Sequence, residues 1–173
     1  GFGGIGKCIG ERLKGLGVIV DAISEELPPL TNEISSFYSR KELNKISKNY
    51  DIIISAAPLT KKTKQIFNYN FFRLMKNNSI FINVSRGALV DTKALLKKKI
   101  YKKFLGIGLD VTNPEPLAKK HFLRKLPNVI LTNHTAGLSD KNRERALGLI
   151  SENISRYYNN LTLLNKVDKE EGY

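Results

Sequence analysis

Short, unbroken apolar runs alternate with longer helix-type stretches along this chain of 173 residues. Within the runs, apolar residues follow one another without polar alternation, and between the runs they recur at helical spacing. Strands of this kind are typical of a parallel sheet covered on both faces, with helices as the crossovers. The pattern predicts an α/β fold with a doubly wound parallel sheet, which binds ligands at the carboxyl ends of its strands. The expected strands are "VIV" (18–20), "DIIISAA" (51–57), "SIFINVS" (79–85), "LGIGLDV" (105–111) and "NVILTN" (128–133).

The helix-type stretches have recognisable ends. The first follows Gly6 and stops at Gly17, and the last, from Ser139 to Asn159, carries its apolar residues on one side. Ser39 is a candidate N-cap for a short helix in "SRKELNKIS", and Asp91 begins the helix "DTKALLKKKIY". We also expect "NYNFFRLMK" (68–76) to be helical.

Composition disfavours several classes of function. The formal net charge is +13, but the lysines are scattered among helix-period apolar residues, with no aromatic stripe and no zinc-ligand spacing. We therefore predict neither nucleic-acid binding nor a metal site. No apolar run reaches the roughly 18 residues that cross a bilayer, and no signal peptide is visible. The single cysteine excludes an internal disulfide, so we expect a cytoplasmic protein without a membrane partner.

The chain opens with the glycine pattern "GFGGIG". Gly1 would allow a tight turn, Gly3 would let the backbone approach a pyrophosphate, and Gly6 would let the following helix pack against the sheet. The helix N-terminus would supply free N–H groups and the positive end of its dipole. The loop is therefore a candidate dinucleotide-binding site, although a glycine-rich end without function is the alternative.

The residue expected to meet the ribose lies near Ser24, because Asp21 comes too early in the chain. The sequence places no arginine beside Ser24 to neutralise a 2′-phosphate, whereas Glu25 and Glu26 would repel one. We therefore favour NAD as the cofactor and keep NADP as the alternative.

Three reactive side chains follow three of the predicted strands: Arg86, Glu115 and His134. Such a set could reduce a 2-keto acid. The arginine could pair with the substrate carboxylate, and the histidine could protonate the oxygen as hydride arrives at carbon. The carboxylate could orient the imidazole and favour its charged form. Taken singly, each has a plainer explanation: a helix cap or surface ion pair for Arg86, and a loop charge for Glu115.

The segments "NVSRGALVDTKALLKKKI", "GIGLDVTNPEPL" and "NVILTNHTAG" resemble the signature segments of the D-isomer-specific 2-hydroxyacid dehydrogenases. The segment "DIIISAAPLTKKTKQIFN" is similar as well, and the resemblance covers nearly the whole chain. It implies a Rossmann domain that binds NAD or NADP, a small 2-keto or 2-hydroxy acid as substrate, and a homodimer. It gives Arg86 the role of binding and polarising the substrate, His134 that of proton donor, and Glu115 that of supporting the histidine.

The resemblance also implies contacts with the cofactor. Gly4 and Ile5 would lie against the pyrophosphate, with Gly1, Gly3 and Gly6 forming the rest of the loop. Ala57 and Pro58 would line the adenosine or ribose side. The nicotinamide half would be bordered by Val84, Ser85 and Arg86, with Asp110 near its amide and His134 to Gly137 closing the site.

This sequence departs from the family pattern in two places. Asn133 stands where a proline usually precedes the histidine, and the glycine loop opens the chain, whereas in the family a segment before it supplies the first strand and most of a substrate domain, so we expect this chain to be a fragment of a longer enzyme. We therefore expect residues 1–140 to form the dinucleotide-binding domain and residues 141–173 to form a helix and tail that return to the absent domain. The predicted function is hydride transfer between NAD(P)H and a glyoxylate-like or hydroxypyruvate-like acid, with this chain as the cofactor-binding fragment. A non-catalytic nucleotide-binding remnant is the alternative, and a basic nucleic-acid-binding protein is a weaker one.

Overall fold

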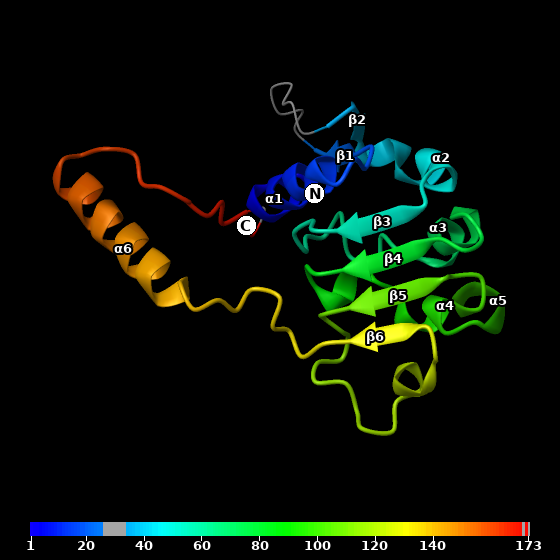
Figure 1. Ribbon diagram of the computed structural model, residues 1–173. Coiled ribbons are helices and arrows are strands. Elements are labelled where there is room, and N and C mark those ends of the chain that lie inside the picture. Colours follow the sequence, from blue (N-terminus) through cyan, green and yellow to red (C-terminus); the bar gives the residue numbers. More distant parts are fainter. Residues whose placement is uncertain (26–33, 171, 173) are drawn as a thin grey trace. The chain divides into compact units, whose positions relative to one another are not determined.

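The computed structural model describes residues 1–25, 34–170 and 172 (Figure 1). It divides into two compact units, Gly1–His134 and Thr135–Tyr173. The larger unit holds both sheets, and the smaller holds one long helix. The predicted functional division after residue 140 stays a prediction.

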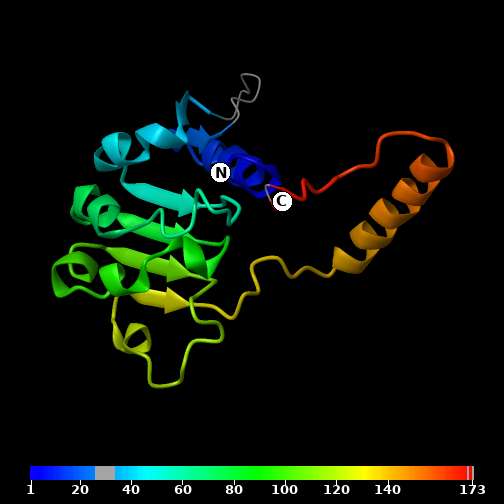
Figure 2. The same ribbon diagram turned by 180° about the vertical axis from the view of Figure 1, so that it is seen from behind.

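All pairings between the strands are parallel, as the sequence predicts. They form a two-stranded sheet, β1-β2, and a four-stranded sheet in the order β3-β4-β5-β6. Figures 1 and 2 show the arrowheads of β3 to β6 pointing to the same side, so the loops that follow them share one edge. The strands are β1 (Asp21–Ser24), β2 (Ser36–Ser39), β3 (Ile52–Ser55), β4 (Ile80–Asn83), β5 (Gly106–Leu109) and β6 (Val129–Leu131).

Helices flank the sheets, which confirms the α/β class. The α-helices are α1 (Gly4–Gly15), α2 (Leu43–Ile46), α3 (Tyr69–Leu74), α4 (Thr92–Leu95), α5 (Lys98–Tyr101) and α6 (Asn142–Tyr158). Four 3₁₀-helices complete the described elements: η1 (Arg40–Glu42), η2 (Ser47–Asn49), η3 (Gly87–Leu89) and η4 (Phe122–Lys125).

The core of the larger unit lies on one face of the four-stranded sheet. Phe81 of β4 and Ile107 of β5 are buried there, side by side in the strand register. They belong to one apolar cluster with Phe71 and Phe72 of α3 and Leu95 of α4. Edge-to-face contacts link the rings, with 5.2 Å between the centroids of Phe72 and Phe81.

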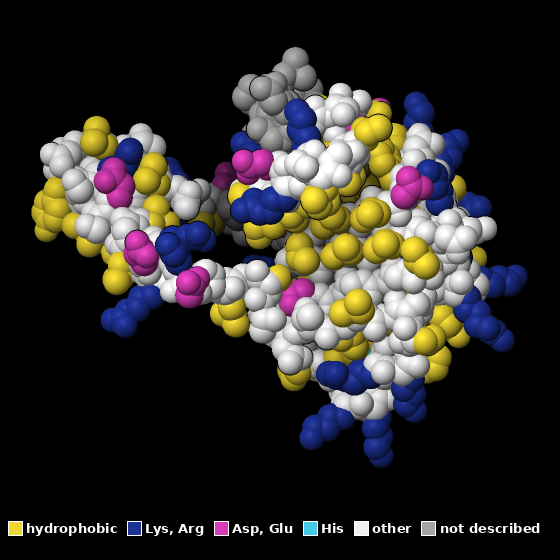
Figure 3. Space-filling view, in the orientation of Figure 1, with side chains coloured by type: hydrophobic (Ala, Val, Ile, Leu, Met, Phe, Trp, Pro, Cys, Tyr) yellow, Lys and Arg dark blue, Asp and Glu magenta, His cyan; other side chains and the backbone are white. Residues whose placement is uncertain are grey.

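The other face of this sheet is less buried within the larger unit. Along β4 and β5, buried residues alternate with half-buried ones, including Ile82 and Gly108. Within Gly1–His134 this second face is therefore less fully covered than the face that holds the core. Figure 3 shows hydrophobic side chains over the middle of the larger unit, with Lys and Arg side chains projecting separately around its margin.

The predicted strand "VIV" is wrong. Gly17 has a φ of 76° just beyond α1, and the Val18 N–H donates back to the Leu13 carbonyl at 3.0 Å. The backbone thus closes the helix end instead of joining a sheet. Ile19 is 81% exposed, and the strand begins only at Asp21. The partner strand β2, "SFYS", was not predicted, because its polar residues hide it among loop signals.

The helix predicted from Asp91 is two short helices. Asp91 does cap α4, accepting a hydrogen bond from the Ala94 N–H at 3.1 Å. The backbone then becomes extended at Lys97, with a ψ of 129°, before α5 begins. An unbroken apolar and basic pattern cannot reveal such a break.

The smaller unit contains α6, close to the predicted span 139–159. Leu147, Ile150 and Ile154 are all exposed on this helix. Among residues 1–25, 34–170 and 172, no helix combines the length and apolar character that a membrane crossing requires.

Ser39 lies at the N-terminus of η1, as predicted. The Glu42 carboxylate accepts hydrogen bonds from the Ser39 N–H at 2.9 Å and from the Ser39 hydroxyl at 3.1 Å. These hydrogen bonds hold the pKa of Glu42 below its ordinary value. The stabilisation is therefore present above the ordinary pKa of the group and is lost as the pH falls through the lowered one.

Replacing Glu42 by glutamine should lower the free energy of unfolding at neutral pH, and the difference from the parent should shrink in acid. Urea unfolding across a pH series measures this. Glu11→Gln is the control, because Glu11 is 69% exposed on α1. A Glu42→Gln variant whose deficit stays constant down to strong acid would contradict the expectation.

Candidate functional site

The glycine loop is packed tightly against the end of β3. A Cβ on Gly1 would lie 2.5 Å from the Ala57 Cα, and a Cβ on Gly6 would lie well under 3.0 Å from the Gly1 carbonyl oxygen. Packing therefore explains the glycines at positions 1 and 6. Gly3 differs, because a Cβ there would meet nothing within 4 Å.

The loop leads into α1 with the features of an anion site. Gly3 is the N-cap, and the first helical hydrogen bond runs from the Lys7 N–H to the Gly3 carbonyl at 2.9 Å. The N–H groups of Gly4 and Ile5 precede that bond and have no acceptor within the helix. No acidic side chain lies in the first turn. Free donors, the positive end of the dipole and open space at Gly3 fit a pyrophosphate.

Strand β2 lies close to this loop. The ring of Phe2, in the loop, contacts the ring of Phe37, in β2, with 5.7 Å between centroids. Ser24 ends β1, whereas Asp21 begins it and accepts a hydrogen bond from the Tyr50 hydroxyl at 2.6 Å. Burial first, and then the hydrogen bond to Asp21, raises the pKa of Tyr50. Asp21 is therefore at the wrong end of the strand to meet a ribose.

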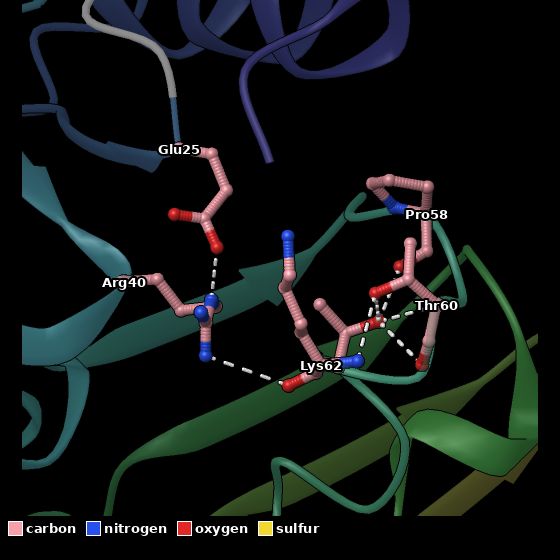
Figure 4. Close-up of polar contacts among 6 residues, drawn as sticks. Glu25, Arg40, Pro58, Thr60 and Lys62 are labelled. Atoms are coloured by element: carbon pink, nitrogen blue, oxygen red, sulfur yellow. Dashed lines mark hydrogen bonds and ion pairs between the residues drawn. The ribbon is translucent and has the colours of Figure 1, made fainter. Parts of the chain in front are cut away.

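No arginine is next to Ser24 in the sequence, but the fold brings one near the end of β1. Arg40 follows β2 directly, and its Nε forms an ion pair with the carboxylate of Glu25, which follows β1 (Figure 4). The position of Arg40 could not be predicted from the sequence, because the strand before it, β2, was not recognised. Glu26, the second predicted repelling carboxylate, lies outside the described residues.

The loop after β3 is held by its threonines. The Thr63 hydroxyl donates to the Pro58 carbonyl at 2.7 Å and accepts from the Thr60 N–H at 2.8 Å (Figure 4). The Ser85 hydroxyl donates to the Ala57 carbonyl. Ala57, Pro58 and Ser85, each predicted at the cofactor site, therefore lie along one continuous part of the sheet edge.

Asn83, the last residue of β4, organises the turn that carries Arg86. Its side chain is fully buried, accepts from the Ser85 N–H at 3.1 Å and donates to the Arg86 carbonyl at 2.9 Å. Val84 donates its N–H to the Ser55 carbonyl at 3.1 Å, which joins this turn to β3. The guanidinium of the exposed Arg86 donates from Nη1 to the Ser85 carbonyl at 2.8 Å. Sequence reasoning missed Asn83, although a buried polar residue at a strand end is the signal.

The turn after Arg86 contacts the loop after β5. A Cβ on Gly87 would fall well under 3.0 Å from the Thr112 carbonyl oxygen, so only glycine fits there. The Thr92 hydroxyl donates to the Asn113 carbonyl at 3.4 Å. This close approach brings the loop of Arg86 against the loop that carries Glu115.

Glu115 and His134 form a pair. The Glu115 Oε1 lies 2.7 Å from the His134 Nδ1, with side chains 38% and 47% exposed. The His134 N–H donates to the Asp110 carbonyl at 2.8 Å, and the Thr132 hydroxyl donates to the Asp110 carboxylate at 2.5 Å. His134 has a φ of 56°, in the left-handed region, which only a few per cent of non-glycine residues adopt.

The larger unit thus brings together most of the predicted site. The glycine loop, Ala57, Pro58, the turn at residues 84–86, Asp110, Glu115 and His134 follow one edge of the sheets. The Arg86 guanidinium and the imidazole are joined through their loops and not by a direct hydrogen bond between described side chains. Gly137 belongs to the smaller unit. The other histidine, His121, caps η4 by accepting from the Leu123 N–H at 3.3 Å.

Comparisons with known proteins agree with this arrangement. Residues 1–136 match the sequence profile of the D-isomer specific 2-hydroxyacid dehydrogenase, NAD binding domain. The chain is 34% identical over 170 residues to a glyoxylate reductase of Thermococcus kodakarensis, covering 96% of this chain and 50% of that protein. It is 36% identical over 155 residues to a glyoxylate reductase of Pyrococcus furiosus, covering 89% of this chain and 45% of that protein.

Solved structures show the same fold. A D-isomer specific 2-hydroxyacid dehydrogenase from Xanthobacter autotrophicus, in complex with NADPH and MES, matches all of this chain and 70% of its own. Its TM-score is 0.90 at 29% identity. An NADPH-dependent glyoxylate/hydroxypyruvate reductase from Sinorhizobium meliloti, in complex with NADP and sulfate, matches 100% of this chain and 55% of its own, with a TM-score of 0.88 at 29% identity.

The chain spans about half the length of the curated relatives that it matches. The matched part contains the glycine loop, both parallel sheets and the Glu115–His134 pair. The chain therefore belongs to the D-isomer-specific 2-hydroxyacid dehydrogenases and comprises their NAD-binding domain.

Proposed function

We propose that this chain supplies the cofactor-binding and proton-donating part of an NAD(P)-dependent reductase of small 2-keto acids, of the glyoxylate or hydroxypyruvate type. The observation that carries the proposal is the 2.7 Å contact between Glu115 Oε1 and His134 Nδ1 at the edge that also holds the glycine loop. The names of the relatives, glyoxylate reductase and glyoxylate/hydroxypyruvate reductase, support the substrate class.

The glycine loop and the first turn of α1 would hold the pyrophosphate. Gly3, Gly4 and Ile5 offer open backbone and free N–H donors there. Ala57 and Pro58 would line the adenosine side, and Val84, Ser85 and Asp110 would border the nicotinamide. When bound, the reduced nicotinamide supplies a hydride to the substrate C2.

His134 would deliver the proton. The carboxylate of Glu115 can only accept, so the contact at Nδ1 requires a proton on that nitrogen. Nε2 would then be the ring nitrogen left to donate, when protonated, to the substrate oxygen. Glu115 is thus a positioning residue that fixes the tautomer and the orientation of the ring.

Arg86 would bind the substrate carboxylate. A guanidinium carries five N–H donors in a fixed fork, and here one hydrogen bond is made to the Ser85 carbonyl. The remaining donors can pair with a carboxylate in two parallel hydrogen bonds. The Asn83 side chain holds the Arg86 backbone by donating a hydrogen bond to the Arg86 carbonyl.

Cofactor binding tests the proposal directly. Gly3→Ala should weaken binding of NADH and NADPH by about ten-fold or more, because a Cβ there enters the space that the pyrophosphate needs. The measurement is a fluorescence titration of the reduced cofactors with the purified chain. Thermal unfolding should change little, since the added Cβ meets nothing within 4 Å.

Gly15→Ala is the matched control. It adds the same methyl at the other end of α1, where nothing lies within 4 Å. Equal cofactor affinity of the Gly3→Ala variant and the parent would remove the glycine loop from the site. A longer polypeptide that contains this chain and binds the cofactor, but does not turn over glyoxylate or hydroxypyruvate, would favour the non-catalytic alternative.

The predicted homodimer and cytoplasmic location remain proposals. The exposed apolar side chains of α6, including Leu147 and Ile150, are a surface that association could cover. Light scattering coupled to size-exclusion chromatography would measure the mass, and cell fractionation would give the location.

A further inference from the structure

We propose that Thr132 is a positioning residue for His134. Its hydroxyl, bound to Asp110, holds the chain in the conformation that presents the imidazole to Glu115. The inference rests on the proposed function, because it concerns the residue that would deliver the proton. It adds a residue that was not among the predicted site residues.

Thr132 and His134 are both attached to Asp110, on either side of Asn133. The Thr132 hydroxyl donates to the Asp110 carboxylate at 2.5 Å, and the His134 N–H donates to the Asp110 carbonyl at 2.8 Å. The paired register of β5 with β6 ends one residue before Thr132. These two hydrogen bonds therefore fix the chain just beyond the sheet, where His134 lies.

Packing contributes little to holding this stretch, because residues 132–134 are exposed. His134 has a φ of 56°, in the left-handed region, where the Cβ of an ordinary residue comes too close to the backbone. A residue with a side chain stays in this conformation only where the surrounding contacts hold it there. The two hydrogen bonds to Asp110 are contacts of that kind.

Asp110 is itself buried and tied to the sheet. It is 6% exposed, and its N–H donates to the Asn83 carbonyl at the end of β4, at 3.0 Å. A hydroxyl that donates to a carboxylate makes a shorter and stronger hydrogen bond than one between neutral groups. Threonine suits position 132 because its branched Cβ restricts rotation about χ1 and so directs the hydroxyl.

The contact between the imidazole and Glu115 depends on this backbone. The His134 Nδ1 lies 2.7 Å from the Glu115 Oε1, and the two side chains are 47% and 38% exposed. The direction in which the backbone presents the ring therefore decides whether the contact forms. Without the Thr132 hydroxyl, we expect residues 132–134 to adopt other conformations and the ring to leave Glu115.

The chain has two histidines, and their ring nitrogens should carry protons differently. The contact with Glu115 requires a proton on the His134 Nδ1. The His121 Nδ1 accepts the Leu123 N–H at 3.3 Å and must be bare. Long-range ¹H–¹⁵N correlation spectra of the purified chain distinguish protonated from bare ring nitrogens, and His121→Asn assigns the signals.

Thr132→Val keeps the shape of the side chain and removes the hydroxyl. The His134 Nδ1 should then lose its proton in a large part of the molecules, with Nε2 protonated instead, while the His121 signals stay unchanged. Thr132→Ser should keep the parent spectrum, because it keeps the hydroxyl. Thr162→Val is the control, since it removes the hydroxyl of an exposed threonine in the smaller unit.

Kinetics provide a second readout in an active polypeptide that contains this chain. Thr132→Val should lower kcat with glyoxylate by about ten- to a hundred-fold, because misplacing a catalytic group by about 1 Å costs that much. Combined with His134→Asn, the same substitution should change kcat by less than about two-fold, since Thr132 acts through the imidazole. A general loss of structure would lower kcat whether or not His134 is present.

The outcomes separate the two proposals. A Thr132→Val chain whose His134 Nδ1 stays protonated, or a rate loss that is the same with and without His134, overturns this inference and leaves the proposed function standing. A parent chain whose His134 Nδ1 is bare removes the Glu115 contact and overturns both. Thermal unfolding identifies a loss of fold, and Thr132→Ala provides a second variant without the hydroxyl if Thr132→Val does not fold.

Discussion

Replacing His134 by asparagine lowers kcat by about two to four powers of ten in an active polypeptide that contains this chain, the range for a general acid–base group. Asparagine is the right replacement because residue 134 has a φ of 56°, which asparagine tolerates better than alanine does. The loss should come from the missing imidazole and not from the backbone. Steady-state oxidation of NADH or NADPH with glyoxylate measures it.

The matched control is His121→Asn, which removes the other histidine of the chain. His121 caps a short 3₁₀-helix and lies outside the proposed site, so kcat should stay within about two-fold of the parent. Rates that fall equally in the two variants would show that histidine content, and not position, matters. An unchanged rate in His134→Asn would remove His134 from the mechanism.

Glu115 can be separated from His134 by a double-mutant cycle. Glu115→Gln should lower kcat, because the positioned tautomer is lost. Adding Glu115→Gln to His134→Asn should cost little more, since Glu115 acts through the imidazole. Independent, additive losses would mean that Glu115 contacts the substrate or the cofactor itself.

Replacing Gly87 by alanine lowers the free energy of unfolding by about 1–3 kcal/mol or more, the usual cost of overpacking a filled interior. The added Cβ would fall on the Thr112 carbonyl, which is backbone and cannot rotate away. Either the turn after Arg86 or the loop before Glu115 must move. Urea unfolding followed by circular dichroism measures the change.

Gly108→Ala is the control for this variant. Gly108 lies in β5 of the same sheet, and a Cβ there would make ordinary contacts with Ile82 at 3.5 Å. Its free energy of unfolding should therefore change much less. If Gly87→Ala is as stable as Gly108→Ala, the two loops are free to separate, and the joining of Arg86 to the Glu115–His134 pair through them is lost.

The sequence predicts the parts of this fold that depend on apolar periodicity. The runs that contain β3, β4, β5 and β6 are distinct, because apolar residues and glycines follow one another in these strands, with a polar residue only at the last position of β3 and β4. The strand around β1 was placed three residues early, because the apolar "VIV" is used to close the end of α1. Strand β2, in which serines flank Phe37 and Tyr38, has no apolar run that would predict a strand.

The residues of the candidate site were likewise predictable only where they follow a recognisable strand. Arg86, Glu115 and His134 could be proposed because each follows a recognisable strand, and the structure then brings Glu115 to His134. Arg40 could not, since its strand was invisible and its partner Glu25 lies 15 positions away in the chain. Residues that follow a recognisable strand were thus more predictable than a residue that follows the unrecognised strand β2.

The buried amide of Asn83 limits which residues can replace it. The amide uses the oxygen toward one neighbour and the nitrogen toward another, so the group must be polar at both ends and uncharged. Aspartate would set a negative oxygen against the Arg86 carbonyl, and leucine would leave an N–H and a C=O stranded without water. We therefore expect Asn83, which has no proposed contact with the substrate, to have as few acceptable replacements as His134, and a saturation library should show position 83 nearly as intolerant as position 134.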